Sequence, residues 1–152
     1  MAANPNTDFV AGAILTASQQ NRFGRGVMAY ARSTVNASQT SGSTDIAAMS
    51  LTFTAVANRL YRATFECFYA VSADSLNNFT ICDSANNVLD QMYQNSVNGI
   101  FMNATMIYTF TASAGPFTIK PRIGPSTGTM TIYGATADNR SYSFLVEDLG
   151  PA

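Results

Sequence analysis

The stretch that decides the fold class of this 152-residue chain is residues 61–71, YRATFECFYAV. Apolar side chains occupy every second position from Tyr61 to Val71, and Arg62, Thr64 and Glu66 lie between them. A period of two predicts a β-strand with one face in the core and the other at the surface. On the surface face, Arg62 and Glu66 are expected to form a weak ion pair.

The same alternation recurs on both sides of this stretch. Further β-rich runs lie at residues 27–35, 49–56, 79–82, 88–94, 100–111, 117–123, 129–134 and 142–147. Clusters of turn-forming residues separate them, at 41–43, 77–78, 84–87, 114–116, 125–128 and 137–139. Short strands at this regular spacing predict an all-β protein, an antiparallel β-sandwich with a jelly-roll-like topology. Pro121 is expected on an edge strand or at a bulge, because proline lacks the N–H that a central strand needs.

The composition excludes several functional classes. Charged residues make up 11% of the chain, against about 25% in ordinary globular domains, and the net charge is −1. The chain has no histidine, which removes Ser–His–Asp and Cys–His nucleophile systems and most catalytic zinc sites. Lys120 is the only lysine, so a basic nucleic-acid-binding surface is not expected. We expect no cofactor, no metal and no nucleic-acid partner.

No segment has the pattern of a signal peptide or a membrane span. The apolar run at residues 9–17 is too short to cross a bilayer, is interrupted by Gly12, and follows no basic residues. We therefore expect synthesis in a cytosol and no membrane partner. Cys67 and Cys82 are either two small buried side chains or a disulfide, and the sequence leaves both open.

Residues 1–26 differ from the rest and are predicted to form an extended N-terminal arm, with residues 27–152 as the sandwich domain. Thr16 and Gln19 have the spacing of a capping box, which predicts a short helix that Gly24 ends. Such a short helix is unstable alone and needs a surface to pack against. That surface is either the body of its own domain or a neighbouring subunit, and we favour a subunit interface, with contact residues Phe9, Val10, Ile14, Leu15, Arg22, Phe23 and Arg25.

The arginines and carboxylates offer weaker signals. Seven arginines against one lysine favour subunit contacts, although Arg122 and Arg140 are isolated in the sequence. A glycosidase needs two carboxylates across a cleft, and the candidates are Glu66, Asp83, Asp90, Glu147 and Asp148. Nothing in the sequence brings two carboxylates together, so we expect no enzymatic activity.

Three segments resemble virion proteins of tailed bacteriophages. Residues 6–21, NTDFVAGAILTASQQN, are similar to the opening of many such proteins. Residues 143–151, SFLVEDLGP, resemble the "VEDxGP" ending of head-fibre, decoration and minor tail proteins, particularly those of phages that infect actinobacteria. Residues 53–62, FTAVANRLYR, resemble a stretch that precedes a long strand in these proteins, with Asn58 where glycine is commoner.

The resemblance implies a viral structural protein, made in the host cytoplasm and then assembled on the virion. We expect a capsid decoration (minor capsid) protein that reinforces the head shell, with the arm bound to the major capsid protein and copies of the domain joined as a homotrimer. The alternative is a receptor-binding knob of a head or tail fibre. That knob would bind a host-surface glycan or protein through polar loops such as Asn77–Asn78 or Asp138–Asn139.

Overall fold

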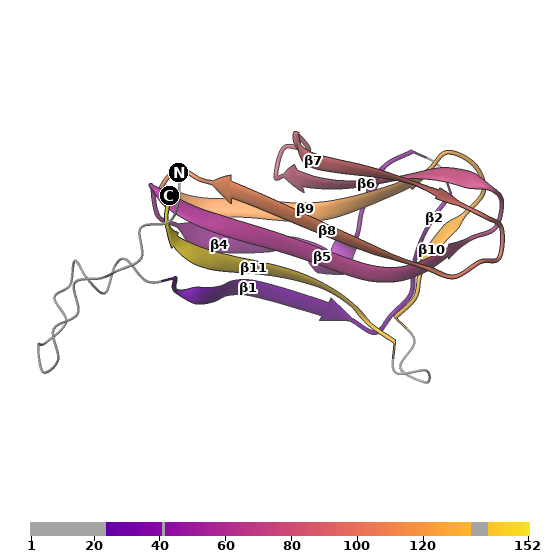
Figure 1. The fold of residues 1–152 in the computed structure, drawn as a ribbon, viewed down its shortest axis with the longest axis horizontal. Coiled ribbons are helices and arrows are strands. Elements are labelled where there is room, and N and C mark those ends of the chain that lie inside the picture. Colours follow the sequence, from indigo (N-terminus) through magenta and orange to yellow (C-terminus); the bar gives the residue numbers. More distant parts are fainter. Residues whose placement is uncertain (1–23, 41, 135–139) are drawn as a thin grey trace, which may run out of the picture.

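Two antiparallel sheets face each other in the computed structural model, which describes residues 24–40, 42–134 and 140–152 (Figure 1). We call the larger one sheet A; it contains β1 (Gly26–Ser33), β2 (Ala37–Gln39), β5 (Arg59–Val71), β8 (Met102–Thr111), β10 (Met130–Ile132) and β11 (Tyr142–Pro151). Sheet B contains β3 (Thr44–Asp45), β4 (Leu51–Ala55), β6 (Ser75–Asp83), β7 (Val88–Ser96) and β9 (Gly115–Pro125). One 3-10 helix, η1 (Ala47–Met49), lies between β3 and β4.

The strand order is that of a jelly roll. Sheet A runs β1-β11-β5-β8, with β10 also pairing with β5 and β2 lying beyond β10. In sheet B, β9 pairs with β3, β4 and β6, and β7 follows β6. The chain therefore changes sheet between β2 and β3, β4 and β5, β5 and β6, β7 and β8, β8 and β9, and β9 and β10. These crossings confirm the predicted antiparallel sandwich, because most sheet neighbours come from distant parts of the sequence, β6 and β7 being the pair joined by a short turn.

The predicted alternation in residues 61–71 is confirmed by β5, which supplies the centre of the core. Tyr61, Phe65 and Tyr69 are fully buried on its inner face. The Phe65 ring lies 6.3 Å from that of Phe144 on β11, and the Tyr69 ring lies 5.1 Å from that of Phe79 on the facing sheet. Aromatic side chains thus fill the space both along sheet A and between the sheets.

The predicted turn at residues 77–78 is wrong, because both residues lie within β6. Asn77 is fully buried, and its amide nitrogen donates to the Ser96 hydroxyl at 2.6 Å and to the Gln94 carbonyl at 3.4 Å. Neighbours in the sheet accept from its amide nitrogen, which is compatible with a strand although asparagine's propensity favours a turn. Its Oδ1 is buried without a hydrogen-bond partner among the described residues. Its burial also removes the Asn77–Asn78 pair from the candidate glycan-binding loops.

The expectation for Pro121 is also wrong, since β9 is paired on both sides. One edge of β9 pairs with β6, and the opposite edge pairs first with β4 and then with β3. On that opposite edge, Pro121 lies between the two paired stretches. Its carbonyl accepts a hydrogen bond there from the Ile46 backbone N–H. Because the N and C=O of a strand residue point to the same side, the N–H that proline lacks would face this break in the pairing.

The predicted arm falls mostly outside the described residues. The short helix at Thr16–Phe23 and six of its contact residues lie there, namely Phe9, Val10, Ile14, Leu15, Arg22 and Phe23. Arg25 is described and exposed, and the first strand begins next to it at Gly26, one residue before the predicted domain boundary.

Both cysteines are free and buried, which resolves the disulfide question left open by the sequence. Cys67 lies in the core, whereas Cys82 is on the outer side of sheet B and belongs to no core cluster. Burial raises the pKa of the Cys67 thiol to about 12, although a backbone hydrogen bond from Ala104 opposes the shift. The reactive thiolate of Cys67 is therefore scarce at neutral pH.

We predict that the native protein does not react with a thiol reagent such as DTNB at pH 8, and that two thiols react after unfolding in guanidinium chloride. At that pH about one Cys67 side chain in ten thousand is ionised, and both sulfurs are shielded from the reagent. Absorbance at 412 nm measures the reaction. Rapid labelling of the folded protein, or fewer than two thiols after denaturation without reductant, would contradict this arrangement.

Candidate attachment end

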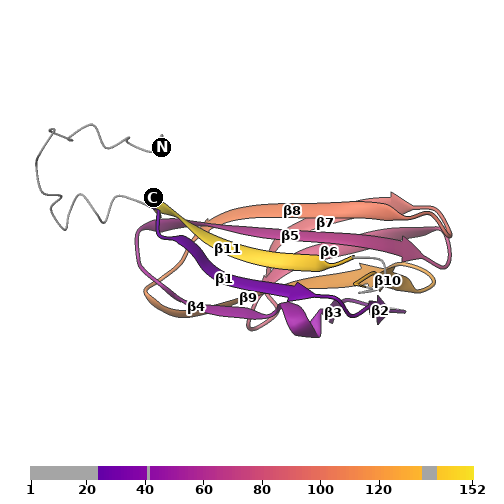
Figure 2. The same ribbon diagram turned by 90° about the horizontal axis from the view of Figure 1, so that it is seen from below.

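Two segments that resemble phage virion proteins, residues 53–62 and 143–151, meet at one end of the sandwich, whereas the third, residues 6–21, lies outside the described residues. Gly24, Asn58 and the C-terminus lie there, at the left of Figures 1 and 2, and we call this the arm end. The centre of the arrangement is an ion pair between Arg59 Nε, at the start of β5, and Asp148 Oδ2, on β11, separated by 2.6 Å. Their side chains are 5% and 0% exposed.

The backbone explains how two charged side chains come to lie inside the sandwich. Arg59 continues the inward-facing series of β5, and Asp148 continues that of β11. A bulge between Asp148 and Gly150 shifts the register, and the Gly150 N–H donates to Asp148 Oδ1 at 2.9 Å. Each carboxylate oxygen thus has a donor, which is the condition under which a buried charge is tolerated.

Asn58 forms the turn that leads into β5, and its φ of 60° lies in the left-handed region. Its carbonyl accepts a hydrogen bond from the Ala152 backbone N–H at 3.0 Å, which ties this turn to the C-terminus. Glycine adopts such a φ without strain, and asparagine does so more readily than most other residues. This conformation accounts for the glycine that the resembling proteins commonly have at this position.

Gly24 packs directly against the backbone at the end of β11. A Cβ on Gly24 would lie 2.6 Å from the Asp148 carbonyl oxygen, so the contact excludes a side chain. Gly24, which follows the resembling opening in sequence, therefore touches the resembling ending in space, although more than 120 residues separate Gly24 from Asp148. A shallow hollow at this end is lined by Ala57, Asn58, Thr111, Ala112, Ser113 and Ala152.

The outer face of sheet A carries a row of side chains across four strands. In register, Tyr30 on β1 lies beside Leu145 on β11, then Thr64 on β5 and Ile107 on β8. Tyr30 is 55% and Ile107 61% exposed. The row is uncharged and presents apolar area to the surface, a feature of contact surfaces.

Charged side chains flank this row on both sides. On one side, Arg62 Nη2 lies 2.8 Å from Glu147 Oε2. The expected partner of Arg62 was Glu66, but the register places Glu147 directly opposite it. On the other side, Arg32 and Glu66 lie on either side of Ser143. The two flanks together carry two arginines and two glutamates, so they add no net charge to this face.

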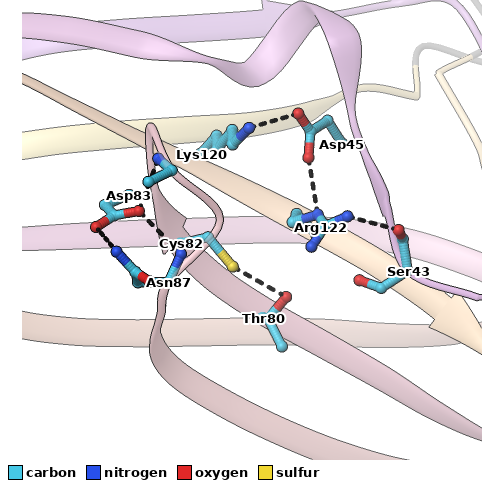
Figure 3. Close-up of polar contacts among 9 residues, drawn as sticks. Ser43, Asp45, Thr80, Cys82, Asp83, Asn87, Lys120 and Arg122 are labelled. Atoms are coloured by element: carbon cyan, nitrogen blue, oxygen red, sulfur yellow. Dashed lines mark hydrogen bonds and ion pairs between the residues drawn. The ribbon is translucent and has the colours of Figure 1, made fainter.

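The outer face of sheet B carries a network of polar side chains, drawn in Figure 3. Asp45 accepts from Lys120 Nζ at 2.6 Å and lies 2.8 Å from Arg122 Nε, while Arg122 Nη2 donates to the Ser43 carbonyl at 2.7 Å. Asp45 belongs to β3, which is two residues long, whereas both cations belong to β9. These contacts hold the short strand against the sheet.

The nearby turn after β6 is organised by Asp83. Its carboxylate accepts from the Asn87 side-chain amide at 2.8 Å and from the backbone N–H groups of Ala85 and Asn87. The hydrogen bond from the Asn87 side chain is the main cause that lowers the pKa of Asp83 below its ordinary value. Asp83 is thus used to shape a turn.

The alternation of the strands separates two of the candidate carboxylates, Glu66 and Asp148. Glu66 is exposed on the outer face of sheet A, whereas Asp148 is buried on the inner face and paired with Arg59. The two carboxylates therefore face opposite sides of one sheet. Within residues 24–40, 42–134 and 140–152, no three His, Cys, Asp or Glu side chains are grouped so that they could hold a metal ion. No helix in these same ranges is long and apolar enough to cross a membrane.

Sequence reasoning missed one cluster altogether, at the end opposite to the arm end. The rings of Phe68 and Phe101 are stacked with centroids 5.2 Å apart, and the Tyr133 ring lies 5.2 Å from that of Phe101. The Arg140 guanidinium lies 5.0, 5.3 and 5.9 Å from the centroids of Phe68, Phe101 and Tyr133. We call these four residues the distal aromatic cluster. Arg140 looked isolated because its partners are distant in sequence, and no local pattern signals the contact.

Comparison with known proteins supports the fold. A scan against protein-family models finds no match, and a search of the curated proteins finds none either. Among solved structures, the chain is similar to the Eiger TNF protein from S. frugiperda, with 10% identity and a TM-score of 0.55 over 84% of this chain and 94% of that one. The likeness confirms a sandwich of the jelly-roll type.

Two more distant likenesses have lower TM-scores. A chain of infectious bursal disease virus Gt strain is 14% identical, with a TM-score of 0.47 over 84% of this chain and 38% of that one. The carbohydrate-binding module CBM6cm-2 from Cellvibrio mixtus lichenase 5A, solved with cellotriose, is 13% identical, with a TM-score of 0.41 over 79% of this chain and 96% of that one. Neither likeness enters the functional argument.

We predict that Arg59→Met lowers the free energy of unfolding by about 3–5 kcal/mol, because it leaves the Asp148 carboxylate buried without its cation. The matched control is Arg62→Met, which breaks the half-exposed pair with Glu147 and should cost about 0–1 kcal/mol. Urea unfolding at one protein concentration measures both. Equal costs for the two variants would show that the buried pair does not hold this end together.

Proposed function

We propose that this protein is a structural component of a bacteriophage virion, and that it decorates the capsid through its arm end. The observation that carries the proposal is the meeting of two virion-like segments, residues 53–62 and 143–151, around Arg59 and Asp148, with Gly24 packed against the same strand end. Those segments are far apart in sequence, so their convergence gives the resemblance a physical reason. The part shared with the resembling virion proteins is the end of the sandwich at which Gly24 lies.

The arm supplies the apolar surface for attachment. In this proposal Phe9, Val10, Ile14, Leu15 and Phe23 bury against the major capsid protein, with Arg22 and Arg25 at the margin. Each fully buried large side chain contributes roughly 1.5–3 kcal/mol. Modest contacts then hold firmly when linked copies bind neighbouring sites, because the second contact forms at a high effective concentration.

We predict that removal of residues 1–23 weakens binding to capsids that lack this protein by at least about 100-fold, since several large apolar side chains are lost. The quadruple serine variant of Phe9, Val10, Ile14 and Leu15 should do the same in the full-length chain. Co-sedimentation with capsids measures binding, circular dichroism checks the fold, and Val97→Ser, an exposed change at the distal end, is the control. Undiminished binding by a folded deletion would refute attachment through the arm.

Copies of the domain are proposed to associate through the outer face of sheet A, as a homotrimer. The row from Tyr30 to Ile107 crosses four strands without a charge, and its flanks carry equal numbers of positive and negative groups. A second copy of this chain meets such a face without net repulsion and covers its apolar area. A strongly acidic or basic partner would gain nothing from it.

We predict that Ile107→Lys weakens self-association at least tenfold, because a lysine in the row is desolvated without a partner carboxylate. Val88→Lys is the matched control, because Val88 is 54% exposed on β7 of the other sheet. Sedimentation equilibrium over a range of concentrations measures the mass of each variant. If both variants retain the wild-type mass, or if the wild type is a monomer, sheet A is not the contact face.

The alternative is a receptor-binding knob of a head or tail fibre, and the distal aromatic cluster is the observation that favours it. Both functions use an anchored end and a free end, so the domain alone does not distinguish them. Copy number does: a decoration protein covers the whole capsid lattice, whereas a fibre knob is present only at its fibres. Quantitative mass spectrometry of purified virions measures this ratio against the major capsid protein.

A further inference from the structure

The distal aromatic cluster lies where an attached domain would be most accessible. It is formed at the end of β5, the start of β8, the segment after β10 and the segment before β11, all at the end away from Gly24 and the C-terminus (Figure 1). Phe101 is 49% exposed, so the cluster is open to solvent on one side. Large aromatic side chains held at a surface form an apolar platform.

Two hollows flank the cluster. One is bounded by Phe68 together with Glu66, Asn103, Thr105, Ser141 and Ser143. The other is bounded by Phe101 and Tyr133 together with Ser72, Asn98, Thr129 and Thr131. The rings thus form a ridge between two depressions whose polar groups are mainly hydroxyls and amides. Small-molecule sites combine apolar walls with a few placed polar groups in this manner.

The charges around the ridge narrow the class of ligand. Arg140 is the cation of the cluster and lies over all three rings, while Glu66 supplies a carboxylate in the adjoining hollow. Asp74, close to the second hollow, accepts from the Asn98 backbone N–H. A nucleic-acid strand also stacks on aromatic rings, but its phosphates need a positively charged groove, which these residues do not form.

We propose that the distal aromatic cluster and its two hollows bind a neutral oligosaccharide. A pyranose ring has one face of C–H groups, which suits the exposed ring of Phe101, and hydroxyls around its edge, which suit the side chains of Asn103, Glu66 and Thr131. Sugars on either side of the ridge occupy the two hollows, so the ligand has at least two rings. Arg140 is a positioning residue that orients the aromatic rings through cation–π contacts.

The proposal rests on the proposed function only for the claim that this end faces away from the particle. An attached domain with its arm end on the capsid presents the cluster outward, where a host-surface glycan would meet it. The binding chemistry itself belongs to the free protein and does not depend on attachment.

The experiment uses the full-length protein on an array of neutral oligosaccharides built from hexoses and N-acetylhexosamines, with oligosaccharides that carry carboxylate or sulfate groups alongside. The strongest neutral binder is then titrated by isothermal calorimetry. We expect Phe101→Ala to weaken binding at least tenfold and Asn103→Ala to weaken it severalfold. Val97→Ala, an equally exposed apolar change in the same connection between β7 and β8, should leave it unchanged.

Three results would overturn the proposal. They are the absence of binding to any neutral oligosaccharide, equal binding by wild type and Phe101→Ala, and a loss of self-association in Phe101→Ala, which would make the cluster a contact between copies. Sedimentation of each variant is therefore measured together with binding. Capsid co-sedimentation of Phe101→Ala separates the two proposals. If Phe101→Ala loses glycan binding and still binds capsids, both proposals are supported. If the wild type binds capsids but no glycan, only the decoration function remains.

Discussion

The buried ion pair between Arg59 and Asp148 is the constraint on which the arm end depends. A charged side chain inside a sandwich is stable only when its partner is held within hydrogen-bonding reach. The pair therefore requires the start of β5 and the end of β11 to keep one register. The bulge before Gly150 completes the coordination of the carboxylate, and Gly24 fits closely against the same backbone. An ion pair in the core thereby fixes the strand end against which Gly24 packs.

The chain has few charged side chains, and many of the described ones form contacts within the fold. Arg59 with Asp148, Arg62 with Glu147, and Lys120 and Arg122 with Asp45 each join two strands. Asp83 shapes a turn through its hydrogen bonds. Most of the remaining surface is formed by hydroxyl, amide and apolar side chains, a composition suited to close contact with neighbouring subunits, because uncharged groups cost less to desolvate.

The fold was largely predictable, and the failures have specific causes. Alternation in β5, β8 and β9 identified the strands because burial of one face imposes a period of two on the local sequence. Asn77 and Pro121 were misplaced because each has a local preference that tertiary contacts override. Asn77 finds its partners on β7, and Pro121 lies at a break between two partner strands. The Arg62 partner was missed for the same reason, since Glu147 is opposite it only through sheet register.

The candidate sites divide in the same way. The sequence alone determined the all-β class and the segments that resemble virion proteins, because periodicity and short motifs are local properties of a chain. It also indicated that Asn58 occupies a position where glycine is common, which its left-handed backbone explains. Only the tertiary structure decided that Gly24, Arg59 and Asp148 meet at one end, and that Phe68, Phe101, Tyr133 and Arg140 gather at the other. Strand order and register bring such residues together, and both are set by packing of the whole sandwich.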